Sequence, residues 1–169
     1  MSPPGVGRQG VRRRTAARFA AVQALYQIEL SGIGAEETVR QFIQHRLGET
    51  ADDVAIGRAD VDYFKVLVLG ASARQNEIDD VIAAGLVPDW PLQRLEIILR
   101  AILRVGTFEL MGRPDVAARV VINEHVDIAH AFFEGAEPGL VNGMLDGLAR
   151  TWRAGELEEQ GGDRSAEAQ

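Results

Sequence analysis

Apolar residues recur with helical spacing in one long segment after another of this 169-residue chain. The segments are rich in Ala, Leu, Ile, Glu and Arg, and Gly and Pro divide them; none alternates apolar and polar residues as a strand does. The sequence therefore predicts an all-α fold of about six to seven helices. The helices are expected over residues 14–31, 35–47, 60–84, 92–111, 116–133 and 139–153. The connections are expected at residues 32–34, 48–57, 85–91, 112–115 and 134–138.

A single folded domain accounts for this length, because 169 residues suffice for one modest core. Residues 1–11 contain two Pro, three Gly and little apolar surface, so we expect a flexible tail there. Residues 154–169 are rich in Glu and Gly and predict a disordered acidic tail. The folded domain is expected over residues 12–153.

The composition excludes several classes of protein. The chain has no Cys, which excludes disulfide scaffolds, thiolate nucleophiles and thiolate zinc sites, and favours the cytoplasm. No apolar run approaches the roughly 20 residues that span a bilayer. The Arg-rich start is not followed by the apolar stretch of a signal peptide. We expect a cytoplasmic protein without a membrane segment.

No catalytic constellation emerges from the motifs. The glycines near the N-terminus spell GxGxxG, but no strand precedes them, so a dinucleotide site is not expected. The only Lys, Lys65, does not follow a Gly, which excludes a GxxxxGK phosphate loop. His125 and His130 are separated by about 140° around a helix and do not converge on one metal ion. We therefore expect no enzyme activity, no cofactor and no metal site.

The basic residues are concentrated at the start of the chain, where five arginines precede the first acid, Glu29. They are Arg8, Arg12, Arg13, Arg14 and Arg18. Arg14 and Arg18 are four residues apart and so share one helix face. Guanidinium groups bind phosphates bidentately and stack on bases, so this edge predicts binding of single-stranded nucleic acid. A solvated basic arm or a membrane-surface anchor is the alternative.

Two of the expected helices have little polar surface. The first has a face of Ala and an opposite face of large apolar residues, so it is either enclosed or leaves one face for a partner. That large face consists of Phe19, Val22, Leu25, Tyr26 and Leu30. The helix over residues 92–111 is predicted to be central, and the small residues 70–73 are expected to let a neighbouring helix approach closely.

Three polar residues lie in positions that call for a partner or a ligand. Glu109 falls on the apolar face of the central helix, so we expect it to accept bonds from an Arg or a helix N-terminus rather than to act as an acid or base. His125 is expected to be a hydrogen-bonded core or interface residue. Asn142 leads a polar line on the last helix and is a candidate for reading an RNA base edge. The alternative for that line is an ordinary solvent face with an ion pair of Asp146 and Arg150.

Four motifs in order resemble the NusB family of bacterial transcription antitermination factors. The motifs are RRR at 12–14 with AAVQALY at 20–26, RAILR at 100–104 with FEL at 108–110, VINE at 121–124, and VNGMLD at 141–146. This resemblance implies a compact double helical bundle. It also implies that the protein binds boxA RNA of ribosomal RNA leader transcripts together with the ribosomal protein NusE, and suppresses termination by the RNA polymerase antitermination complex.

The resemblance also implies roles for particular residues. Arg12, Arg13, Arg14 and Arg18 are expected to contact RNA, with Asn142 as a further RNA-binding candidate. Tyr26, Val22 and Arg100 are expected to face the protein partner. Exchanging Arg14 and Arg18 for Glu is expected to abolish RNA binding and to leave folding nearly unchanged. Family members usually carry an acid just before Arg100, on the surface that meets NusE, whereas this chain has Leu99.

Three other functions stay open at this point. One is a helical RNA-binding domain related to the front domain of ribosomal RNA cytosine methyltransferases, although 169 residues leave no room for the methyltransferase itself. A second is a homodimeric helical interaction module, in which a second copy covers the apolar face of the first helix. A third is a helical DNA-binding regulator, but none of the later helices is basic.

Overall fold

The computed structural model describes residues 6–47, 59–88 and 90–157. In these ranges all regular structure is helical and no strand forms, which confirms the all-α prediction. The α-helices are α1 (Val6–Ser31), α2 (Ala35–His45), α3 (Val61–Ala73), α4 (Gln75–Gly85), α5 (Ile97–Gly112), α6 (Ala118–Phe132) and α7 (Glu137–Trp152), and a 3₁₀-helix, η1 (Leu92–Arg94), precedes α5. None of the helices described is long and apolar enough to cross a membrane.

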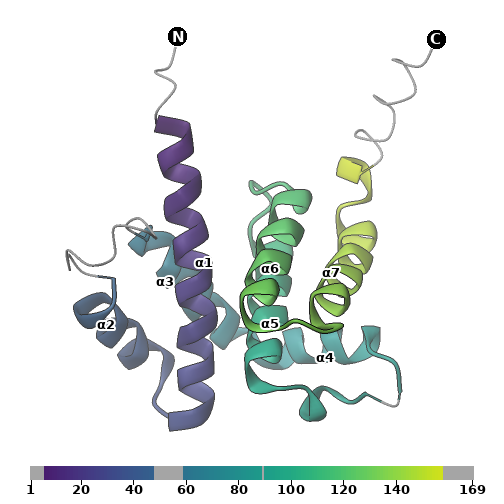
Figure 1. Cartoon of the computed structure of the whole chain (residues 1–169), viewed down its shortest axis with the longest axis horizontal. Coiled ribbons are helices and arrows are strands. Elements are labelled where there is room, and N and C mark those ends of the chain that lie inside the picture. The colour runs from purple at the N-terminus through teal and green to yellow at the C-terminus, as the bar shows by residue number, and fades with distance from the viewer. Residues whose placement is uncertain (1–5, 48–58, 89, 158–169) are drawn as a thin grey trace.

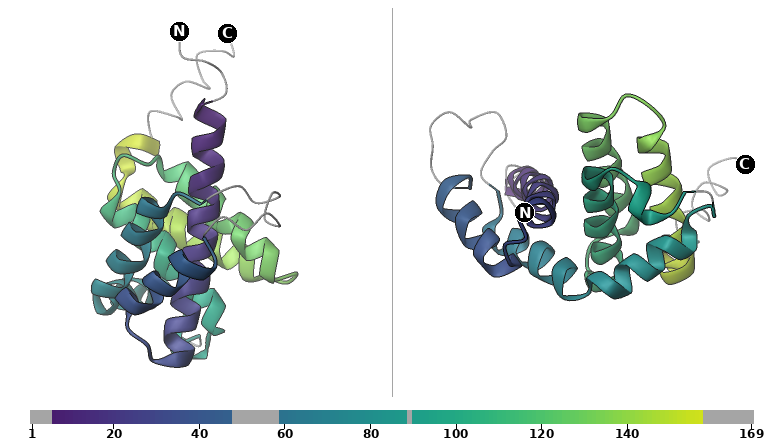
Figure 2. Two further views of the ribbon diagram at one scale, coloured as in Figure 1. Left: turned by 90° about the vertical axis from the view of Figure 1, so that its left-hand side faces the viewer. Right: turned by 90° about the horizontal axis from the view of Figure 1, so that it is seen from below.

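The helices form two groups that meet where α1 and α5 pack together (Figure 1). The first group contains α1, α2 and α3, and in the second α4, α6 and α7 surround α5. The α4 helix carries the chain from the first group to the second, as the view from below in Figure 2 shows. Because α5 contacts α1, α3, α4, α6 and α7, the prediction that residues 92–111 contain the central helix is confirmed. The double helical bundle is confirmed as well.

Local backbone chemistry fixes two of the helix ends. Gly32 has a φ of +73°, in the left-handed region that favours glycine, and its N–H donates to the Ile28 carbonyl at 2.9 Å. This ends α1 and lets α2 turn back along it. The carboxylate of Asp60 accepts the backbone N–H of Tyr63 at 3.0 Å, which is an N-cap for α3. Tyr63 therefore lies in a fixed first turn.

Two of the predicted helices differ in the structure. The helix expected over 60–84 is divided at Arg74, whose φ of −107° and ψ of 19° leave the helical region. No Pro or Gly marks this break in the sequence; α3 packs on α1 and α5, while the separate direction of α4 lets it pack on α5 and α7. The helix expected over 92–111 starts as a 3₁₀ turn, and α5 begins only at Ile97 because Leu95 is extended, with a ψ of 145°.

Helical residues extend into both of the expected tails. The α1 helix begins at Val6, within the residues 1–11 that were expected to form the first tail. Residues 154–157, at the start of the second expected tail, are helical as well. Glu156 accepts the Ala118 N–H at 2.9 Å, which ties this end of the chain to the start of α6. The other parts of the predicted tails and one predicted connection lie outside the described residues, at 1–5, 158–169 and 48–57.

Small side chains allow the central helices to approach closely. The alanine face of α1 is buried, and its members are at most 6% exposed: Ala16, Ala17, Ala20, Ala21 and Ala24. On α3, a Cβ atom at Gly70 would lie 2.1 Å from Cζ of Phe108, so only glycine permits this contact between α3 and α5. The expectation that a neighbour packs closely on residues 70–73 is confirmed at Gly70.

Candidate nucleic-acid interface

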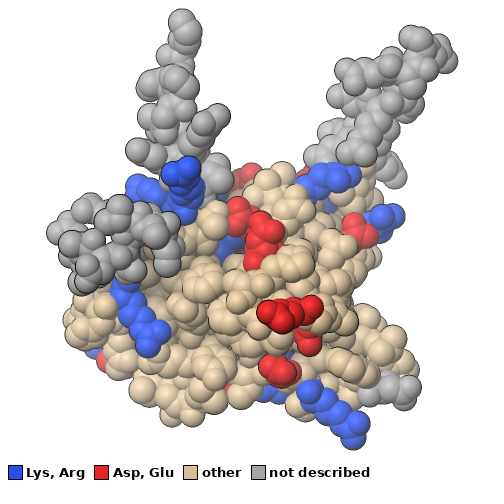
Figure 3. Space-filling view, in the orientation of Figure 1, with Lys and Arg blue, Asp and Glu red and all other residues tan. Residues whose placement is uncertain are grey.

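The arginines near the start of α1 form an exposed cationic group. Arg12 and Arg13 are exposed and Arg14 is half-buried. The guanidinium carbon of Arg14 lies 4.4 Å from the centre of the Tyr63 ring, a cation–π contact. None of these three arginines forms an ion pair with any residue that the structure describes. Figure 3 shows basic side chains gathered where α1 rises above the rest of the molecule. We name Arg12, Arg13 and Arg14 the α1 arginine group.

Arg18, one helical turn further along α1, is not part of that surface. Its side chain is 2% exposed, and its Nε and Nη2 atoms donate to the two carboxylate oxygens of Glu109 at 2.8 and 3.0 Å. The O–H of Tyr63 donates to the same carboxylate at 2.6 Å. The prediction that Arg18 contacts RNA is therefore corrected: the guanidinium is enclosed and already bonded. The prediction that Glu109 accepts bonds from an Arg is confirmed.

His125 completes this buried cluster. It is fully buried, and its Nδ1 donates to the Val121 carbonyl at 2.8 Å, while its Nε2 lies 3.8 Å from Glu109 Oε1. Burial lowers the pKa of His125, and the attraction of Glu109 only partly opposes this. Burial raises the pKa of Glu109, but the hydrogen bonds and charge of Arg18 and the bond from the Tyr63 hydroxyl outweigh it and lower that pKa. The prediction of a hydrogen-bonded core histidine is confirmed.

The buried position of Arg18 changes the expected effect of charge reversal. A Glu at position 18 would place a second carboxylate beside Glu109, inside the protein. The double exchange of Arg14 and Arg18 would then unfold the protein, so a loss of RNA binding in it would not identify a contact. The sequence expectation that folding stays nearly unchanged does not fit this geometry. A charge reversal that leaves the interior unchanged has to be made in the α1 arginine group.

A groove near the other end of α1 carries the predicted partner face. Tyr26 is 39% exposed, Leu30 58% and Phe132 40%, which is unusual for side chains of this size. The full lining is Gln23, Tyr26, Gln27, Leu30, Ser31, Arg46, Glu96, Ile97, Ile98 and Phe132. The sequence expectation of an apolar face left open on the first helix therefore holds for the end of α1, around Tyr26 and Leu30.

The other two residues predicted for the partner face, Val22 and Arg100, are less exposed than Tyr26. Val22 is fully buried, so the prediction that it contacts a partner is corrected: it is a core residue. Arg100 is 13% exposed and ion-paired with Glu29. Glu29 also bonds Arg104, which in turn binds Asp79 through two bonds of 2.8 and 3.0 Å. Leu99 is 2% exposed, so this departure from the family pattern lies in the core and not on the surface.

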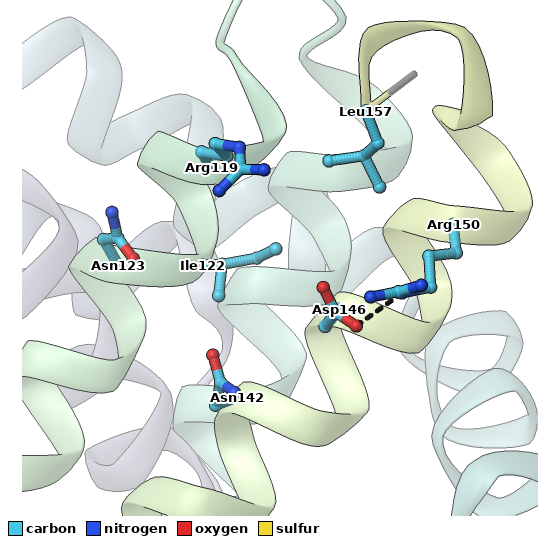
Figure 4. Close-up of a pocket in the computed structure, with 7 residues that line it drawn as sticks. All are labelled: Arg119, Ile122, Asn123, Asn142, Asp146, Arg150 and Leu157. Carbon is cyan, nitrogen blue, oxygen red and sulfur yellow. Dashed lines mark hydrogen bonds and ion pairs between the residues drawn. The ribbon is translucent and has the colours of Figure 1, made fainter. Parts of the chain in front are cut away.

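Asn142 lies on a second surface, between α6 and α7. It is exposed and borders a depression whose lining is Arg119, Ile122, Asn123, Asn142, Asp146, Arg150 and Leu157. Figure 4 shows Asn142 and Asp146 on α7 across from Ile122 on α6. Arg150 donates to Asp146 at 2.7 Å, the ion pair that the sequence offered as the alternative for this line. The role of Asn142 in RNA binding stays a prediction.

Sequence reasoning missed Tyr63, which links the α1 arginine group to the buried cluster. Tyr63 is 3% exposed, and it contacts Arg14 through its ring and Glu109 through its hydroxyl. No local motif points to it, because the contacts join positions 46 or more residues apart. The described residues contain no cluster of three His, Cys, Asp or Glu side chains that could hold a metal ion.

Comparisons with known proteins agree with this geometry. The profile of the NusB family matches residues 15–150. The transcription antitermination protein NusB of Maricaulis maris (strain MCS10) is 49% identical over 146 residues, which are 86% of this chain and 91% of that protein. The solved structure of T. maritima NusB is similar at a TM-score of 0.70 and 29% identity, covering 94% of this chain and 99% of that one. A structure of antitermination factors NusB and NusE in complex with dsRNA is similar at a TM-score of 0.67 and 26% identity, covering 83% and 98%.

Proposed function

The chain belongs to the NusB family of transcription antitermination proteins, and on that premise we propose that it binds boxA-type single-stranded RNA of ribosomal RNA leader transcripts together with NusE and suppresses premature termination by RNA polymerase. The family is not one of enzymes. The observation that carries the proposal is the α1 arginine group, which forms no ion pair with any of the described residues although the whole chain has a net charge of −7. A similar solved structure contains NusB and NusE in complex with dsRNA, which supports NusE and RNA as partners.

The chemistry of the group suits single-stranded RNA. Guanidinium groups bind backbone phosphates, and their flat faces stack on unpaired bases. Arg12 and Arg13 are exposed and form no ion pair with the described residues, while Arg14 is held against Tyr63. With three phosphates neutralised, the logarithm of affinity should fall with the logarithm of salt concentration at a slope of about −2 for a single strand.

The test is fluorescence anisotropy of a labelled boxA RNA, with a scrambled RNA as competitor and with or without NusE. We expect binding that prefers boxA, that NusE strengthens, and that is lost when Arg12 and Arg13 are exchanged for Glu. The control with the same change of charge exchanges Arg40 and Arg94 for Glu, because both are exposed arginines outside the group, on α2 and η1. Equal loss in both variants, or no binding of RNA with or without NusE, would reject the proposal.

We propose that the groove at Tyr26 is the NusE-binding face. Its exposed Tyr26, Leu30 and Phe132 offer apolar contact area with a polar rim, as protein interfaces do. We expect Tyr26→Asp to abolish capture of NusE while boxA binding by the isolated protein is kept. A homodimer that covers the same groove is the competing assignment, and sedimentation velocity of the protein alone separates the two, since a stable dimer would contradict a free NusE face.

A further inference from the structure

Three guanidinium groups lie against the ring of Tyr63, two from α1 and one from the residue that follows α5. The guanidinium carbons of Arg14, Arg113 and Arg18 lie 4.4, 5.1 and 5.4 Å from the ring centre. Arg18 is the buried member and is bonded to Glu109. Arg14 and Arg113 remain at the edge of the bundle, where one comes from α1 and the other follows α5. The ring therefore brings together two cationic side chains that are 99 residues apart in sequence.

The position of this ring is fixed from two sides. The Tyr63 hydroxyl donates to Glu109 at 2.6 Å, and the backbone N–H of Tyr63 donates to Asp60 at 3.0 Å. A guanidinium stacked on an aromatic face keeps its N–H groups free at its edge. The cation–π contact also restricts the rotamers of a side chain that otherwise loses much entropy on binding a ligand. Arg14 and Arg113 are thus preorganised to bind an anion.

Arg113 carries a carboxylate in the place where a phosphate would bind. Its Nε and Nη2 donate to the two oxygens of Asp115 at 3.0 and 2.8 Å, the fork geometry with which arginine also binds phosphate. Asp115 is 55% exposed. The bonds from Arg113 lower the pKa of Asp115, and the charge of Arg14 adds to this. The carboxylate is therefore attracted by both arginines that Tyr63 holds.

We propose that Arg113 and Arg14, held together on the Tyr63 ring, form one site for an RNA backbone phosphate, and that Asp115 occupies the phosphate position on Arg113 until RNA displaces it. The proposal rests on the RNA-binding function proposed above and adds Arg113 and Asp115 to it. A phosphate in this site continues the α1 arginine group toward the end of α5. An anion must displace Asp115 to reach Arg113. An anion that the neighbouring arginines do not also bind is therefore bound more weakly.

The decisive variant is Asp115→Asn, measured by the same boxA anisotropy assay. Release of Arg113 from an exposed ion pair should raise RNA affinity by up to about fivefold. The matched control is Glu77→Gln, because Arg74 and Glu77 form the same two-bond pair at 2.9 Å and Glu77 is also 55% exposed. Both variants remove one negative charge, so a general electrostatic effect would raise affinity equally in both and would overturn the proposal.

A second variant tests Arg113 itself. We expect Arg113→Gln to make the salt-dependence slope shallower by about 0.7, the contribution of one phosphate contact to a single strand. In the double variant Arg113→Gln with Asp115→Asn, the gain from Asp115→Asn should disappear. An unchanged slope, or a gain that persists without Arg113, contradicts the site.

The outcomes separate this site from the function on which it rests. Wild-type protein that binds boxA RNA through Arg12 and Arg13, with no response to either Arg113→Gln or Asp115→Asn, overturns the Tyr63 site alone. Absence of RNA binding in the wild type overturns both. Arg113 and Asp115 are partly exposed, so neither variant is expected to unfold the protein, and melting curves of each variant check this.

Discussion

Arg14 and Arg18 lie one turn apart on the same helix, yet they have opposite environments. Arg14 is half-buried, rests on the face of Tyr63 and has no ion-pair partner among the described residues. Arg18 is 2% exposed and donates two hydrogen bonds to Glu109, the same carboxylate that the Tyr63 hydroxyl bonds. One arginine is available to a ligand, and the other joins α1 to α5.

This comparison shows that two arginines on the same helix face need not have the same role. Residues four apart share a helix face, but α1 extends beyond the helices that cover it (Figure 1). The end of the covered region falls between the two arginines. Tyr63 lies at that boundary, with its ring toward Arg14 and its hydroxyl toward Glu109, so it contacts both the half-buried and the buried arginine.

The largest expected effect is the loss of one member of the buried pair. Arg18→Ala should lower the free energy of unfolding by about 3–5 kcal/mol, because it leaves the Glu109 carboxylate buried without its cation. Urea unfolding followed by circular dichroism measures this. RNA affinity per folded molecule should change little. A variant as stable as the wild type would contradict an interior role for Arg18.

Replacing the whole buried cluster should cost less than breaking it. In Arg18→Met with Glu109→Leu both charges are removed together, so the loss of stability should be smaller than in Arg18→Ala. The Tyr63 hydroxyl then lacks its acceptor, and adding Tyr63→Phe should recover about 1–3 kcal/mol. The same urea titration measures both steps. A double variant that is less stable than either single variant would show that the pair is a net source of stability.

Acid should weaken the buried cluster in two stages. Burial gives His125 a pKa below its usual 6.5, so the unfolded chain takes up the proton first and stability falls as the pH drops below about 6.5. The lowered pKa of Glu109 gives stability that is present above 4.5 and lost as the pH falls further, toward its folded pKa. Each group changes the free energy of unfolding by at most about 1.4 kcal/mol per pH unit.

The measurement is the urea midpoint from pH 8 to pH 4. We expect His125→Gln to flatten the change between pH 6.5 and 5, while leaving the steeper loss at lower pH. Stability that rises between pH 7 and pH 5.5 would show that His125 takes up a proton in the folded protein, facing Glu109.

The sequence predicted the need for a partner at Glu109 but not which arginine supplies it. A carboxylate on an apolar helix face must be bonded, and this follows from the order of residues alone. The choice of Arg18 over Arg14 depends on where α5 ends relative to α1, which is a property of the packed fold. The break at Arg74 and the role of Tyr63 were missed for the same reason, since neither has a local signal. The all-α class and the central helix were predicted because periodicity is local.

The smallest expected effect on stability is at Arg14, and it reverses the pattern of Arg18. Arg14→Ala removes a cation–π contact at a partly exposed position, which is worth about 0.5–1 kcal/mol, so the protein should unfold at nearly the same urea concentration. The slope of RNA affinity against salt should nevertheless become shallower by about 0.7. Arg18→Ala should show a large loss of stability with an unchanged slope. If both variants changed the slope equally, the two arginines would share one RNA-binding face, and the boundary that Tyr63 forms between surface and interior would not separate their functions.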